Sequence, residues 1–156
     1  DNATTESALK HALLTYEKIT KKKFKVCVFL TTTDIFRSIG LIKKCINTLI
    51  KNPKLESVFA GSKTHKNYWE IKGNKFQRLK KWMKYYKSRQ IKKNIFREDT
   101  GIICASRASL WRRGKRIGEK VKIIDNPSQF SYVDIHNSID LKLAELIIKN
   151  FNIKIE

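Results

Sequence analysis

The 156-residue sequence has little cysteine and no long apolar run. Its three cysteines, Cys27, Cys45 and Cys104, are odd in number, lie far apart among apolar residues, and lack metal-ligand spacing. These features argue against a disulfide framework and predict reduced core cysteines in a cytoplasmic protein. No apolar run approaches the length of a membrane span. The polar first residues lead into an amphipathic helix and predict no signal peptide.

Acidic side chains are also scarce. The 14 Asp and Glu residues face 34 Lys and Arg, which gives a formal net charge of +20 and a pI near 10.0. Such a balance favours anionic partners, including nucleic acid, acidic lipid, nucleotides and acidic sugars. Lysine, isoleucine and asparagine are abundant throughout the chain, so a lysine-rich proteome explains the same bias, and both explanations stay open.

The sequence does contain enough apolar residues to form a hydrophobic core. The hydrophobic fraction of 41% and the chain length predict one globular domain, residues 1–156. Apolar residues at helical spacing predict a first helix capped by Thr5, a second closed by Pro53 and a last one capped by Ser138. Buried strands are expected at residues 24–30, 57–61, 101–105, 121–124 and 133–136. This alternation predicts an α/β fold with a mostly parallel sheet.

One segment breaks the alternation. Between Ile71 and Arg97 there is no acidic residue. Lysines and arginines alternate there with Phe76, Trp82, Tyr85 and Tyr86. We predict that residues 66–97 form an insertion that stands outside the main sheet.

Polar clusters follow several of the predicted strands. They are residues 31–37 (TTTDIFR), 63–69 (KTHKNYW) and 134–136 (DIH), while 97–100 (REDT) precedes a strand. In open α/β sheets, ligands bind beyond the carboxyl ends of the strands. Each cluster also has an ordinary structural explanation. Asp134 suits a helix cap or a salt bridge, His136 a structural histidine, and His65 a surface loop.

A further basic cluster lies between two predicted strands. Its members are Arg112, Arg113, Lys115 and Arg116. Such a group is typical of a solvated face.

In this order, the segments resemble a known family. ATTESALKHALL (residues 3–14), CVFLTTTDIFR (27–37), SVFAGSKTHKNYW (57–69) and VDIHNSIDLKLAE (133–145) are similar to successive segments of the acylneuraminate cytidylyltransferases, the CMP-sialic acid synthetases. Residues 96–121 fit the stretch that leads into the last strands. The resemblance implies a Rossmann-like sheet of the nucleotide-diphospho-sugar transferase type, flanked by helices.

The resemblance also implies a reaction. The anomeric hydroxyl of a nine-carbon acid sugar, sialic acid or a legionaminic-type relative, attacks the α-phosphate of CTP, and pyrophosphate leaves. Asp134 matches the family's magnesium ligand and is the catalytic candidate. His136 stands where the family has a second acid, and imidazole is a poorer magnesium ligand than carboxylate. Asp140 is a candidate for the second shell of that metal.

The expected sugar site draws on other positions. Thr31 replaces a glutamine that contacts the sugar in the family. Arg89 and Arg97 match arginines of the family's protruding dimerisation element, and arginine suits bidentate binding of a carboxylate. His65 and Lys66 are further candidates. The family forms homodimers, and Trp82, Tyr85 and Tyr86 are expected at the dimer interface.

The family opens with a strand and a loop that holds the CTP phosphates. The sequence from Asp1 onward contains neither, so we expect an incomplete nucleotide site in this chain alone. Two alternatives follow. One is a non-catalytic basic module that binds nucleic acid, supported by the net charge and the aromatic residues of the insertion. The other is a non-catalytic dimeric scaffold.

Overall fold

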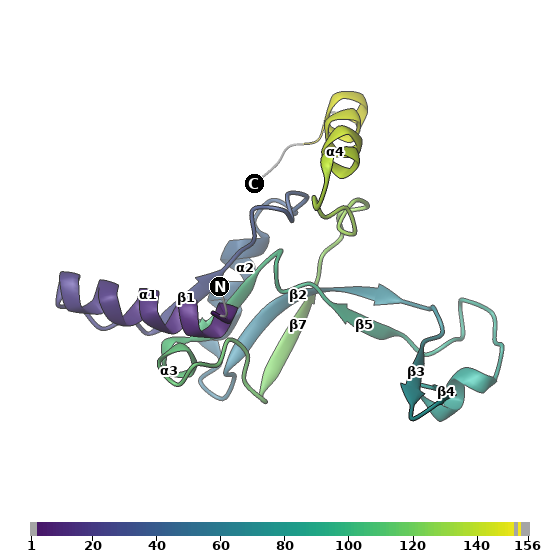
Figure 1. Ribbon diagram of the computed structural model, residues 1–156, viewed down its shortest axis with the longest axis horizontal. Helices are drawn as coiled ribbons and strands as arrows, with labels where there is room; N and C mark the ends of the chain where they lie inside the picture. Colours follow the sequence, from purple (N-terminus) through teal and green to yellow (C-terminus); the bar gives the residue numbers. More distant parts are fainter. Residues whose placement is uncertain (1–2, 152, 154–156) are drawn as a thin grey trace. The chain divides into compact units, whose positions relative to one another are not determined.

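The computed structural model describes residues 3–151 and 153, so Asp1 lies outside the described residues. The chain divides into two compact units (Figure 1): Asp1–Ser62 with Glu98–Glu156, and Lys63–Arg97. The predicted insertion, residues 66–97, falls within the second unit.

The first unit is built on a sheet in which β1 (Val26–Phe29), β6 (Cys104–Arg107) and β2 (Ser57–Thr64) are neighbours in that order. β7 (Val121–Asp125) also pairs with β2, and so does β5 (Ile95–Glu98), of which only Glu98 belongs to the first unit. β6 runs antiparallel to both β1 and β2, and β7 runs parallel to β2. β1, β2 and β7 therefore share one direction, which confirms a mostly parallel sheet. The reversed direction of β6 was not predicted.

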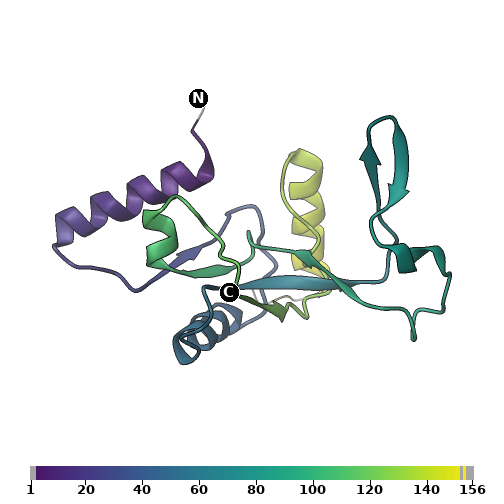
Figure 2. The ribbon, with the colours of Figure 1, turned by 90° about the horizontal axis from the view of Figure 1, so that it is seen from below.

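Alternate residues of β1 serve two different cores, because successive side chains of a strand point to opposite faces. Val26 and Val28 pack against the cluster that contains Cys45 and Leu49 of α2 (Leu41–Lys51). Cys27 and Phe29 belong to the other cluster, with Leu13 and Trp111. These last two residues come from α1 (Thr5–Thr20) and α3 (Ala108–Arg112). Figure 2 shows α1 and α3 on one side of the sheet and α2 on the other. The prediction of helices flanking the sheet is confirmed.

The prediction that the cysteines lie in the core without disulfides is confirmed within the described residues. Cys27, Cys45 and Cys104 are free and buried. Burial raises the pKa of Cys27 to about 11 and that of Cys45 to about 12, so both stay protonated thiols at neutral pH.

Two predicted helix caps are wrong by one residue. Thr4, rather than Thr5, caps α1, because its side chain accepts the backbone N–H of Ser7 at 3.1 Å. Asn137, rather than Ser138, caps α4 (Ser138–Phe151): Asn137 Oδ1 accepts the N–H groups of Ile139 and Asp140 at 2.8 and 3.0 Å. In both cases a side chain just before the helix reaches its first unpaired N–H groups.

The predicted strand at 133–136 is also wrong, since these residues form no strand. Val133 instead packs with Phe36 and with Ala144 and Ile147 of α4. The segment was apolar because it covers a helix, and apolar content alone does not distinguish this role from a strand.

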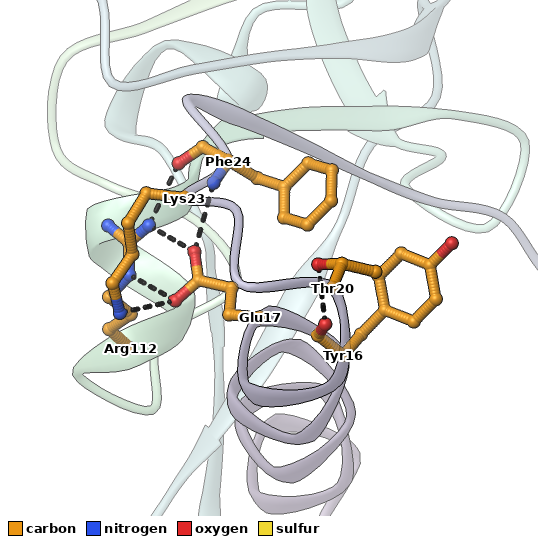
Figure 3. Close-up of polar contacts among 6 residues, drawn as sticks. All are labelled: Tyr16, Glu17, Thr20, Lys23, Phe24 and Arg112. Atoms are coloured by element: carbon orange, nitrogen blue, oxygen red, sulfur yellow. Dashed lines mark hydrogen bonds and ion pairs between the residues drawn. The ribbon is translucent and has the colours of Figure 1, made fainter.

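The basic cluster around Arg112 is not simply a solvated face. Arg112 and Lys23 converge on the carboxylate of Glu17, which is only 4% exposed (Figure 3). Arg112 Nη2 lies 2.5 Å from Glu17 Oε1 and Lys23 Nζ lies 2.9 Å from Oε2, while the N–H of Phe24 donates to Oε1 at 3.0 Å. This buried carboxylate links α1 to α3.

The second unit contains a β-hairpin and one turn of 3-10 helix. β3 (Trp69–Lys72) pairs antiparallel with β4 (Lys75–Arg78), and η1 spans Lys81–Lys84. Gly73 at the hairpin turn has φ 60°, a conformation that favours glycine. Met83 of η1 is fully buried, and its sulfur accepts the N–H of Tyr68 at 3.5 Å. In the described part of the chain, no helix has the length and apolar character needed to cross a membrane.

Candidate functional site

Because β1, β2 and β7 run in one direction, the segments that follow β1 and β7 meet at one edge of the sheet. Thr31 lies just past the end of β1 and Asn126 just past the end of β7. The start of the antiparallel strand β6 reaches the same edge, which brings residues 99–102 beside the loop after β1.

Thr31 is held tightly at this edge. Its N–H donates to the carbonyl of Gly101 at 2.8 Å, and its hydroxyl donates to Asp34 Oδ2 at 2.6 Å. Arg37 closes the loop, since its guanidinium donates to the carbonyl oxygens of Ile102, at 2.7 Å, and of Thr31. The predicted sugar-contacting residue is therefore fixed by an acid and an arginine that the sequence did not single out.

A second group of polar side chains lies buried beside this loop. Ser38 Oγ donates to Asn126 Oδ1 at 2.6 Å. Ser62 Oγ donates to Asp99 Oδ2 at 2.6 Å and lies 3.3 Å from Ser131 Oγ. Asn126, Asp99 and Ser131 are all at least nine-tenths buried. Buried polar groups of this kind hold a loop edge in one arrangement.

The segment that carries Asp134 joins the same edge. The N–H of Ile135 donates to the carbonyl of Thr33 at 3.2 Å, which places residues 134–136 against the loop after β1. Asp134 Oδ2 lies 2.7 Å from His136 Nε2, and the two side chains are 36% and 72% exposed. Asp134 Oδ1 is buried and has no hydrogen-bond partner. An unpaired buried carboxylate oxygen is costly unless a ligand supplies its partner.

Asp140 serves the backbone of this segment. Its Oδ2 accepts the N–H groups of His136 and Asn137 at 2.9 and 3.1 Å. With Asn137 it forms a reciprocal cap at the start of α4. Asp140 thus fixes the chain directly after Asp134.

A magnesium ion is the ligand that the sequence resemblance implies here. Among the described residues there is no group of three or more His, Cys, Asp or Glu side chains that could hold a metal. The free oxygen of Asp134 fits a magnesium ion that keeps most of its waters and also binds substrate phosphates. His136 is paired through Nε2, and Asp140 Oδ2 is occupied by backbone amides, so neither adds an evident direct ligand.

The other predicted site residues belong to the second unit. His65 is half-buried, and its carbonyl oxygen accepts a hydrogen bond from Lys92. Lys66, Arg89 and Arg97 are exposed. Their roles at a sugar site stay predictions.

Sequence reasoning missed several residues of the edge. Asn126 directly follows a predicted strand, so the rule that singled out Thr31 could have found it. Asp34 and Asp99 lie within the polar clusters TTTDIFR and REDT but were not named. Ser62 and Ser131 gave no local signal, because their partner lies 37 or more residues away in the chain.

Comparisons with known proteins identify the fold. No protein-family model matches the sequence, and no curated protein matches it. The solved structure of 4-diphosphocytidyl-2C-methyl-D-erythritol synthase from Anaerococcus prevotii DSM 20548 is similar, with a TM-score of 0.60 and 15% identity. The match covers 96% of this chain and 66% of that one. At this identity the likeness shows the fold alone: a mostly parallel sheet flanked by helices, as in that synthase.

Proposed function

We propose that this chain belongs to a cytidylyltransferase that joins an acidic nine-carbon sugar to the cytidylyl group of CTP and releases pyrophosphate. The observation that carries the proposal is the buried, unpartnered Oδ1 of Asp134 at the edge where β1 and β7 end. The name of the similar structure, a synthase of a diphosphocytidyl product, supports a cytidylyl substrate. The motifs around Thr31 and Asp134 support the acid sugar.

Asp134 is the residue expected to hold magnesium. A magnesium ion bound there would neutralise charge that develops on the phosphates. His136 would keep the Asp134 carboxylate oriented through its 2.7 Å contact, and Asp140 would hold the backbone of that segment in place. Thr31, fixed by Asp34 and Gly101, would border the sugar site.

The sugar carboxylate needs cationic partners. Arg89 and Arg97 are the candidates for bidentate contacts with this carboxylate. His65 and Lys66 are further candidates from the sequence. A homodimer in the cytoplasm completes the proposal, and sedimentation of the purified protein tests its oligomeric state separately.

The test is pyrophosphate release by the full product of the gene, supplied with CTP, magnesium and a panel of acidic nine-carbon sugars. We expect release that depends on both CTP and the sugar. Asp134→Asn should lower kcat by at least about 10²-fold, because the neutral amide is a much weaker ligand than carboxylate for the magnesium that would neutralise the phosphates.

The matched control is Glu145→Gln, which neutralises an exposed acid on α4 and should leave turnover unchanged. Magnesium-dependent turnover that Asp134→Asn does not alter would exclude the assigned role of Asp134. Absence of sugar-dependent release with every member of the panel would contradict the proposed reaction.

A further inference from the structure

The second unit exposes aromatic rings among basic side chains, and the proposed cytidylyl transfer assigns no role to these rings. We propose that this unit binds single-stranded nucleic acid. This inference concerns a second ligand and does not rest on the cytidylyltransferase proposal.

The charge of the unit is almost entirely of one sign. Residues 63–97 contain 13 Lys and Arg residues and one acid, Glu70. Glu70 is also engaged within the hairpin, since Gln77 Nε2 donates to its Oε1 at 2.6 Å. A cationic surface of this kind tracks a phosphate backbone and gains affinity by releasing counterions.

The hairpin separates its side chains into two faces. Trp69 and Ile71 of β3 lie opposite Arg78 and Phe76 of β4, and the side chains of all four share one face because residues alternate along a strand. Ile71 is 70% exposed and Phe76 is 72% exposed. The described protein therefore presents an apolar, aromatic platform to solvent.

The residues after the hairpin extend the same chemistry. Tyr85 and Tyr86 are 56% and 78% exposed. Lys84 Nζ lies 5.0 Å from the centre of the Tyr85 ring, and the guanidinium of Arg78 lies 4.2 Å from that of Trp69. Aromatic rings accompanied by cations stack on bases of any sequence while the cations meet the phosphates.

The sequence resemblance places Tyr85 and Tyr86 at a homodimer interface, so a second copy of this chain is the other partner that could cover these rings. It would bring the same excess of positive charge to the contact, and like charges at an interface are unfavourable. A polyanion with flat, stacking bases matches both the charge and the exposed rings.

The test measures fluorescence anisotropy of a labelled, mixed-sequence single-stranded oligonucleotide, as RNA and as DNA, titrated with the full chain at several salt concentrations. We expect tight binding at low salt that weakens steeply as salt rises. Tyr85→Ala should weaken binding by roughly 5- to 150-fold, the loss expected for one stacked base. Lys84→Gln should lower the salt slope by about 0.7, the share of one phosphate in a single strand.

Tyr16→Ala is the matched control, because Tyr16 of the first unit is also 56% exposed, and Lys51→Gln is the control for charge. Neither should change binding.

The inference is overturned if binding vanishes at physiological salt, or if Tyr85→Ala binds like the parent. It is equally overturned if Tyr85→Ala converts a dimer to a monomer while the parent binds no oligonucleotide. Pyrophosphate release is read in parallel, so the two proposals can fail independently.

Discussion

Gly101 lies where no larger residue fits. A Cβ at this position would stand 1.9 Å from Asp34 Oδ2 and 2.6 Å from Thr31 Oγ1. We therefore expect Gly101→Ala to push the loop after β1 away from residues 99–102 and to lower the free energy of unfolding by about 1–3 kcal/mol. Urea denaturation of the variant and the parent measures this difference.

A double-mutant cycle identifies the cause of that loss. In an Asp34→Ala background the closest obstructing atom, Asp34 Oδ2, is gone while Thr31 Oγ1 remains, so Gly101→Ala should cost less than it does in the parent. Equal costs in the two backgrounds would show that the contact with Asp34 is not responsible.

Asn137 caps α4 in place of Ser138, which the sequence predicted as the cap. Asn137→Ala should remove the cap of α4 and lower the free energy of unfolding by about 1 kcal/mol. Ser138→Ala is the matched control, and its effect should stay below about 0.5 kcal/mol because Ser138 is exposed and lies inside the helix. The reverse order, measured by urea denaturation, would restore Ser138 as the cap.

At the scale of elements, Glu17 couples α1 to α3. Glu17 accepts hydrogen bonds from Arg112, which has the larger effect, and from Lys23. These bonds lower the pKa of Glu17 from 4.5 to about 2. A carboxylate whose pKa is lowered by folding stabilises the protein fully above its unfolded pKa and loses this contribution as the pH falls. The contribution of Glu17 should therefore be complete above about pH 5 and disappear between pH 4.5 and 2.

The comparison of Glu17→Gln with the parent tests this sign. At neutral pH the variant should be clearly less stable. The gap should narrow on acidification and close as the pH falls through about 2, where Glu17 becomes protonated and resembles glutamine. Glu6→Gln on the same helix is the control, because Glu6 is 38% exposed and lies 3.8 Å from Arg116. A gap between Glu17→Gln and parent that does not change with pH would exclude the charge as its cause.

The strands that the sequence predicted are the buried ones. β1, β2 and β7 were predicted because apolar runs mark strands that pack in a core. β3 and β4 were missed because each has only four residues and packs in no core, so the short alternation of Trp69, Glu70, Ile71 and Lys72 is not part of an apolar run. The site divides in the same way. Thr31 and Asp134 follow from strand ends and family motifs, whereas the contacts of Ser62 with Asp99 and Ser131 depend on folding that brings distant segments together.

For the whole molecule, the division into two units predicts that the first folds without most of the second. All three hydrophobic clusters of the described chain consist of residues outside 63–97. We expect a variant in which a short Gly-Ser linker replaces residues 66–94 to keep its helical circular dichroism and to unfold cooperatively in urea.

The same variant separates the functions proposed for the two units. Residues 66–94 carry 11 Lys and Arg residues and one Glu, so their removal halves the formal net charge. In the full product of the gene, this replacement should abolish oligonucleotide binding and lower sugar-dependent pyrophosphate release through the loss of Arg89. CTP binding measured by calorimetry should stay at the level of the parent, because Asp134 and its edge remain. A folded variant that still binds oligonucleotides as tightly as the parent would move the nucleic-acid surface to the first unit.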